Sequence, residues 1–177
     1  FRFVRDLLAA RKLETVLVDF GVMADPPIVP DIPAEAVAKA GGHSLAELRA
    51  SGDKALAMET MAAGLERVVK DLHAQGRLGG ILGMAGSGGT AIATRAMRAL
   101  PIGVPKVMAS TVAGGDVSAF AGTVDITMMP TIVDVAGINS ISRQIYANAA
   151  NAIVGMVSGE LPPLQETKPL ITASMFG

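Results

Sequence analysis

The sequence contains no cysteine and no tryptophan, and aromatic residues make up only 3% of its 177 residues. Without cysteine the chain has neither disulfides nor thiolate metal ligands, which fits a reducing compartment, so we expect a cytoplasmic protein. The few aromatic rings and a formal net charge of −1 provide neither the base stacking nor the positive field that nucleic-acid binding requires. We therefore expect no nucleic-acid partner.

Long apolar runs and histidine clusters are missing as well. The longest uncharged stretch, Leu78–Thr94, is broken by glycines and hydroxyl residues, so it does not have the composition of a membrane-spanning helix. The two histidines, His43 and His73, lack metal-ligand spacing, and a surface or capping role is the simpler interpretation. In contrast, hydrophobic residues reach 50% and charged residues only 18%, which predicts one folded domain with a substantial core.

Segments with helical periodicity alternate with short apolar segments along the chain. Helices are predicted for the amphipathic start and for Ala34–Ala40, Asp53–Ala74, a segment ending near Ala99, and Asn139–Val157. Strands are predicted for Glu14–Phe20, Gly79–Met84, Val104–Ala109, Val124–Met129 and Pro169–Phe176. This alternation predicts an α/β fold with a parallel sheet covered by helices on both faces. The first helix has no strand before it in this pattern and the last strand has no helix after it, so we expect material to be missing or supplied by another segment.

Gly86, Ser87, Gly88, Gly89 and Thr90 follow a predicted strand and open a predicted helix. Glycines allow positive φ and close approach of a ligand, and amides at a helix start favour an anion such as phosphate or carboxylate. A structural turn with Thr90 as helix cap is the alternative. The pattern G-x-G-x-x-A is a variant of the dinucleotide fingerprint, but no acidic residue follows the next strand, and the lysine of a Walker loop is absent.

A second polar segment follows the next predicted strand, with Ser110, Thr111, Gly114, Gly115 and Asp116. Hydroxyls and paired glycines suit a phosphate or a ribose, and the Asp116 carboxylate suits a ribose hydroxyl or Mg²⁺. Helix capping is an equally good role for Asp116.

Two further carboxylates lie at strand ends. Asp19 closes the first predicted strand, and Asp125 opens the strand Val124–Met129. A structural role is at least as good an interpretation for each carboxylate, and their joint placement adds only modest support for a site.

Four ordered motifs resemble one family. They are Gly83–Thr90, Val104–Asp116, Gly122–Met129 and Lys168–Gly177. Together they are similar to the ATP-binding family that includes a plant inhibitor of tobamovirus RNA replication and many bacterial proteins of unknown function. The resemblance implies two Rossmann-like subdomains of which residues 1–177 form the first, without the initial strand and glycine-containing loop that usually open the family. It also implies ATP with Mg²⁺, a second subdomain of the same protein and a homodimer as partners, and no membrane.

Carried over by motif, the resemblance implies a single nucleotide pocket. It would be lined by the residues of both glycine-containing segments, with Asp116 on the metal, Asp125 close by and Asp19 near the adenosine end. Two alternatives stay open. One is an enzyme that acts on a small phosphorylated or carboxylated metabolite, with Asp116 or Asp125 as metal ligand or base. The other is an interaction module whose dimer the nucleotide stabilises.

Overall fold

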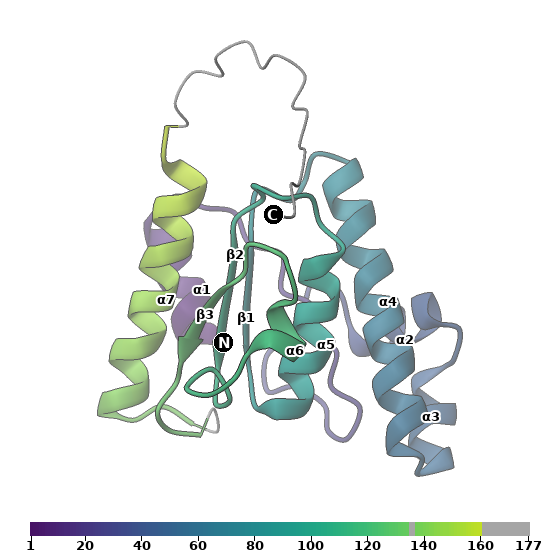
Figure 1. Ribbon diagram of the computed structural model, residues 1–177. Helices are drawn as coiled ribbons and strands as arrows, with labels where there is room; N and C mark the ends of the chain where they lie inside the picture. The colour runs from purple at the N-terminus through teal and green to yellow at the C-terminus, as the bar shows by residue number, and fades with distance from the viewer. Residues whose placement is uncertain (135–136, 161–177) are drawn as a thin grey trace, which may run out of the picture.

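The computed structural model describes residues 1–134 and 137–160, and its centre is a parallel sheet (Figure 1). The three strands are β1 (Ile81–Ala85), β2 (Lys106–Ser110) and β3 (Thr127–Pro130), in the order β1-β2-β3. Ile81 lies opposite Lys106, and Val107 lies opposite Thr127. All three strands therefore end at one edge, and the segments that follow β1 and β2 begin side by side there.

Helices cover both faces of this sheet. The α-helices are α1 (Arg2–Ala10), α2 (Ala34–Gly41), α3 (Leu45–Ser51), α4 (Lys54–Ala74), α5 (Ser87–Arg98), the short α6 (Ser118–Ala121) and α7 (Ser140–Ser158). One face carries α5, with α4 and then α2 outside it, and the other face carries α7 and α1 (Figure 1). The result confirms the predicted α/β, Rossmann-like fold with three layers.

The central strand explains why the sequence shows no alternation of polar and apolar residues. Met108 packs against Ala93 and Met97 of α5, whereas Val107 and Ala109 pack against α7. Both faces of β2 are therefore covered, and every residue of the strand is buried. A strand buried on both sides requires apolar residues at successive positions.

Capping residues in the sequence mark where helices begin. Asp53 caps α4 through its carboxylate, and Asn139 caps α7 in a capping box, so both predicted helix starts are confirmed within one residue. Helix α3 was not predicted, although Ser44 and Glu47 form a capping box at its start. Within the described residues, none of the helices is both long and apolar enough to cross a membrane.

Helices α2 and α4 meet at two glycines. A Cβ on Gly64 would lie 1.9 Å from the carbonyl oxygen of Val37, and a Cβ on Gly41 would lie 2.1 Å from that of Thr60. The backbones therefore touch directly, because neither glycine carries a side chain that would hold the helices apart.

One strand prediction is wrong. The segment Glu14–Phe20 is extended, but it forms a single parallel bridge, between Val18 and Ile32, and no strand of the sheet. Its apolar composition satisfies strand propensity, but a strand also needs a paired neighbour along its edge. The predicted strand Pro169–Phe176 lies outside the described residues.

Candidate functional site

The start of α5 presents unpaired backbone amides at the carboxyl edge of the sheet. Gly86 is the N-cap residue and has no side chain that could accept a hydrogen bond. The first bond of the helix runs from the Thr90 amide to the Gly86 carbonyl oxygen at 2.8 Å. Within the described residues, the amides of Ser87, Gly88 and Gly89 have no acceptor. Amides in this position, together with the helix dipole, favour an anion.

The backbone conformation of the glycines differs from the one that the sequence allowed for them. None of Gly86, Gly88 and Gly89 has a positive φ, and the helix already begins at Ser87. Gly89 is required by packing, because its Cβ would lie 2.7 Å from the Cβ of Ala85 on β1. A Cβ on Gly88 would meet only the Met58 methyl group, at 3.9 Å. Gly88 thus leaves space above the helix start, and Gly89 lets α5 approach β1.

Two predicted ligand hydroxyls face the protein interior. Thr90 and Ser110 are fully buried, and their hydroxyl oxygens are 2.6 Å apart. The Thr90 hydroxyl lies 2.8 Å from the Gly86 carbonyl oxygen, and the Ser110 hydroxyl accepts a bond from the Val112 amide at 3.2 Å. The pair therefore links α5 to the turn after β2 and is not exposed to a ligand.

Replacing Thr90 by valine keeps the shape of the side chain but leaves the Ser110 hydroxyl without its partner. We expect a loss of about 1–2 kcal/mol in the free energy of unfolding, measured by urea titration. Combining it with Ser110→Ala should cost less than the sum of the single changes, because both remove the same contact. Strictly additive losses would contradict the described pair.

Five predicted residues are exposed at the surface. They are Ser87, Thr111, Gly114, Gly115 and Asp116. The Thr111 hydroxyl lies 3.8 Å from the position of a Cβ on Gly86, so the two glycine-containing segments do meet at this edge. The structure thus brings Thr111 to the start of α5.

Asp116 is the acidic residue of this group. Its carboxylate accepts a hydrogen bond from the Ser118 amide at 2.9 Å, at the start of α6, and this bond lowers the pKa of the carboxyl group. The N-cap residue of α6 is Val117, so Asp116 forms a turn just ahead of the helix instead of the predicted cap, and the carboxylate stays ionised at neutral pH. No group of three or more acidic or histidine residues that could hold a metal occurs in the described residues. Any ion at Asp116 would thus need ligands from the bound molecule or water.

Asp19 belongs to a turn that lies close to α5. Its carboxylate accepts a bond from the Gly21 amide at 2.9 Å. The next residue, Phe20, places a ring carbon 3.7 Å from the position of a Cβ on Gly89. The Asp19 turn therefore lies next to the first turn of α5.

Asp125 lies at the opposite edge of the sheet. Its carboxylate is 2.8 Å from the Lys106 ammonium nitrogen and 2.8 Å from the Gly103 amide, and the ammonium also donates to the Pro101 and Val104 carbonyls. Lys106 opens β2 and Ser110 closes it, so roughly 13 Å of strand separates the two edges. Asp125 precedes its strand, and its expected place near the nucleotide is corrected accordingly.

The basic residues on α5 are engaged elsewhere. Arg95 forms ion pairs with Glu59 and Glu66 of α4, and Arg98 donates to the carbonyl oxygen of Phe120. None of the predicted site residues is basic. The described part of the site thus offers neutral amides and hydroxyls to an anion.

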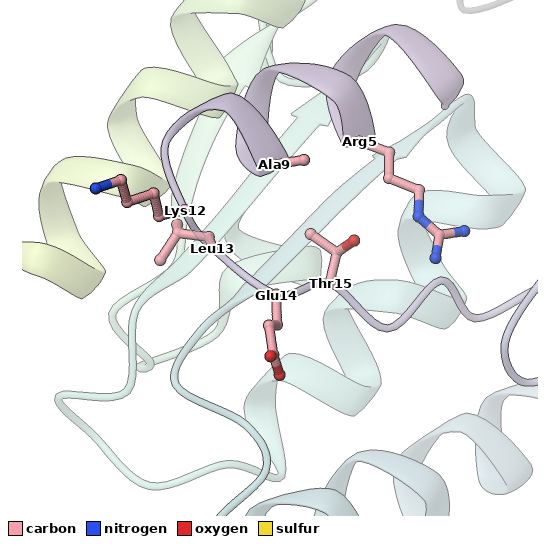
Figure 2. Close-up of a pocket in the computed structure, with 6 residues that line it drawn as sticks. All are labelled: Arg5, Ala9, Lys12, Leu13, Glu14 and Thr15. Atoms are coloured by element: carbon pink, nitrogen blue, oxygen red, sulfur yellow. The ribbon is translucent and has the colours of Figure 1, made fainter.

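The two described cavities lie apart from these segments. One, of about 530 Å³, lies between α1 and the chain that follows it and is lined by Arg5, Ala9, Lys12, Leu13, Glu14 and Thr15 (Figure 2). The other, of about 540 Å³, lies between α1 and α7. Neither is lined by a predicted site residue.

Comparison with known proteins places the chain among relatives of unknown role. It is 45% identical to a UPF0261 protein of Clostridium tetani over 100% of the chain and 44% of that protein. It is 43% identical to a UPF0261 protein of Rhizobium meliloti over 92% of the chain and 39% of that protein. Over 70% of the chain, and 17% of the relative, it is 39% identical to the ToMV resistance protein Tm-1(GCR237) of Solanum lycopersicum.

The chain thus spans less than half the length of these relatives. The sequence profile of the N-terminal domain of the uncharacterised protein family UPF0261 matches residues 1–162, which include both glycine-containing segments. The chain therefore belongs to the UPF0261 family and contains its N-terminal domain.

Proposed function

We propose that the carboxyl edge of the sheet binds the phosphates of a nucleotide, with ATP and Mg²⁺ as the ligand. The observation that supports this most is the uncapped start of α5. Three consecutive amides, from Ser87 to Gly89, have no acceptor in the described residues and lie at the positive end of a 12-residue helix. Amides at a helix start that no side chain caps are left to water or a ligand, and a phosphate oxygen suits this position.

The surrounding groups suit the remaining parts of such a ligand. The exposed hydroxyls of Ser87 and Thr111 border the amides and would donate to phosphate oxygens. The ionised Asp116 would hold Mg²⁺ through one carboxylate oxygen, with phosphate oxygens and water as the other ligands. Mg²⁺ would offset phosphate charge that no basic site residue of the described chain neutralises. Asp19, in the turn next to the first turn of α5, would accept a bond from a ribose hydroxyl.

The Gly88→Asp variant separates binding from folding. The new Cβ would have its nearest neighbour at 3.9 Å, so the side chain fits. A carboxylate in the first turn of a helix is favourable by about 0.3–1 kcal/mol. We therefore expect stability to be unchanged or slightly raised, while the affinity for MgATP, measured by calorimetry on the full-length protein, falls at least about 100-fold through charge repulsion.

Gly155→Asp is the matched control. Gly155 is an exposed glycine of α7 with no atom within 4 Å of an added Cβ, so the same charge is added on a helix away from the α5 start. This variant should bind MgATP like the unmodified protein. If the unmodified protein is folded and shows no MgATP binding, or if Gly88→Asp binds normally, the nucleotide proposal fails.

A further inference from the structure

A chain of hydrogen bonds runs through the interior between the two glycine-containing segments. The Ser110 hydroxyl accepts from the Val112 amide at 3.2 Å. The same oxygen lies 2.6 Å from the Thr90 hydroxyl, which lies 2.8 Å from the Gly86 carbonyl oxygen. Each hydroxyl has one proton, and the Gly86 carbonyl can only accept. Both hydroxyls are therefore satisfied in one arrangement, in which Ser110 donates to Thr90 and Thr90 donates to Gly86.

The Gly86 end of this chain orients the peptide group that opens α5. The Gly86 carbonyl accepts from both the amide and the hydroxyl of Thr90, each at 2.8 Å. This carbonyl and the Ser87 amide belong to one peptide unit, which is planar and trans, so the two groups point in opposite directions. The Ser87 amide, the first of the three amides without an acceptor, is therefore directed away from the buried Thr90 side chain.

The Val112 end orients a peptide group of the second segment in the same way. Because the Val112 amide is bonded inward to the Ser110 hydroxyl, the Thr111 carbonyl of the same peptide unit points outward. Ser110 is itself anchored on both sides of the turn. Its carbonyl oxygen accepts from the Ala113 amide at 3.3 Å and from the Thr131 amide, just after β3, at 3.1 Å. The chain of bonds thus connects α5, β2 and the end of β3 at the carboxyl edge.

We propose that Thr90 and Ser110 are positioning residues of the nucleotide site, which hold the Ser87 amide and the Thr111 carbonyl in the orientation that bound MgATP uses. Positioning of this kind rests on the proposed function, since it matters only where a nucleotide binds. Thr90 and Ser110 are 0% exposed, so they act without touching the ligand. The Ser87 amide would donate to a phosphate oxygen, and the Thr111 carbonyl would accept from a water molecule on Mg²⁺. Groups already held in the bound orientation lose less freedom on binding, which raises the affinity.

Calorimetry of MgATP with the full-length protein tests the positioning role, at a temperature where circular dichroism shows each variant to be folded. Ser110→Ala removes the middle of the chain of bonds and leaves every exposed group of the site in place. We expect it to weaken binding roughly tenfold, and Thr90→Val to weaken it to a similar extent. Thr90→Ser keeps the hydroxyl, so its affinity should stay within about twofold of that of the unmodified protein.

Thr94→Val is the matched control on the same helix. Thr94 is as buried as Thr90, but its hydroxyl donates at 2.8 Å to the Thr90 carbonyl oxygen, within α5. The change therefore removes a buried threonine hydroxyl without touching the connection to the second segment. We expect Thr94→Val to bind MgATP like the unmodified protein.

Two results would overturn the positioning role and leave the proposed function intact. One is normal MgATP binding by both Ser110→Ala and Thr90→Val. The other is equal weakening by Thr94→Val, because a general loosening of α5 would then account for every loss. Absence of binding by the folded, unmodified protein is a separate result, which would remove the proposed function and the positioning role with it.

Discussion

Gly64→Ala should destabilise the domain by about 3 kcal/mol or more, a large effect for the addition of one methyl group. The new Cβ would lie 1.9 Å from the Val37 carbonyl oxygen and 2.9 Å from its carbonyl carbon. These are backbone atoms of α2, so a rotamer change cannot relieve the overlap, and the two helices must separate. The separation would open the core between them, where Val37, Met61 and Leu65 are buried.

The control for this change is Gly155→Ala, which adds the same methyl group in the last turn of α7. No atom lies within 4 Å of its Cβ, so only helix propensity changes, and we expect a gain of about 0.5–1 kcal/mol. Urea unfolding followed by circular dichroism measures both variants. Equal effects of the two alanines would show that the helices are not in direct backbone contact.

Asp125→Ala is the second change with a large expected effect. It leaves the Lys106 ammonium, whose side chain is 0% exposed, without a counter-charge in the interior. Losing one partner of a buried pair costs up to 3–5 kcal/mol. The Asp125 side chain is 41% exposed, so water already screens the pair, and we expect a smaller loss of about 2 kcal/mol in urea unfolding.

Lys106→Met is the matched variant of the same pair. It removes the buried charge and leaves a carboxylate that water can solvate, so it should cost less than Asp125→Ala. The double variant should be more stable than Asp125→Ala alone, because it no longer buries an unpaired charge. A double variant as unstable as the sum of both changes would contradict this account.

The same pair gives a pH dependence. The Lys106 hydrogen bond, followed by that of the Gly103 amide, lowers the pKa of Asp125 below its ordinary value of 3.8. A lowered folded-state pKa adds stability above the ordinary value and loses it as the pH falls through the folded value. The stability difference between the unmodified protein and Asp125→Asn should therefore be constant above about pH 5 and shrink below about pH 4 in urea titrations at each pH.

The sequence was sufficient for the architecture, because helix caps and doubly buried strands leave local signals. Asp53 and Asn139 mark helix starts, and the apolar run of β2 marks a strand buried on both sides. The sequence was not sufficient to predict which segments pair as strands. Whether Glu14–Phe20 joins a sheet depends on the segment that lies beside it. Strand propensity is a property of the segment itself and does not identify that neighbour.

The candidate site was predicted only in part, for a related reason. Composition identifies a hydroxyl but not the direction of its side chain, so the sequence did not show that Thr90 and Ser110 are buried and bonded to each other. The position of Asp125 in the sequence already indicated the edge of the sheet at which it lies. A residue that opens a parallel strand lies at the amino edge, whereas ligands bind at the carboxyl edge.

The single tyrosine of the chain gives it a specific optical property. Tyr146 on α7 packs against Val4 of α1, and its hydroxyl is buried without a hydrogen-bond partner in residues 1–134 and 137–160. Burial, followed by the charge of Asp134, raises the pKa of this phenol. Since the chain has no tryptophan, its absorbance near 295 nm in alkali comes from one ring. Phenolate absorbance therefore reports the separation of α1 from α7 without an added label.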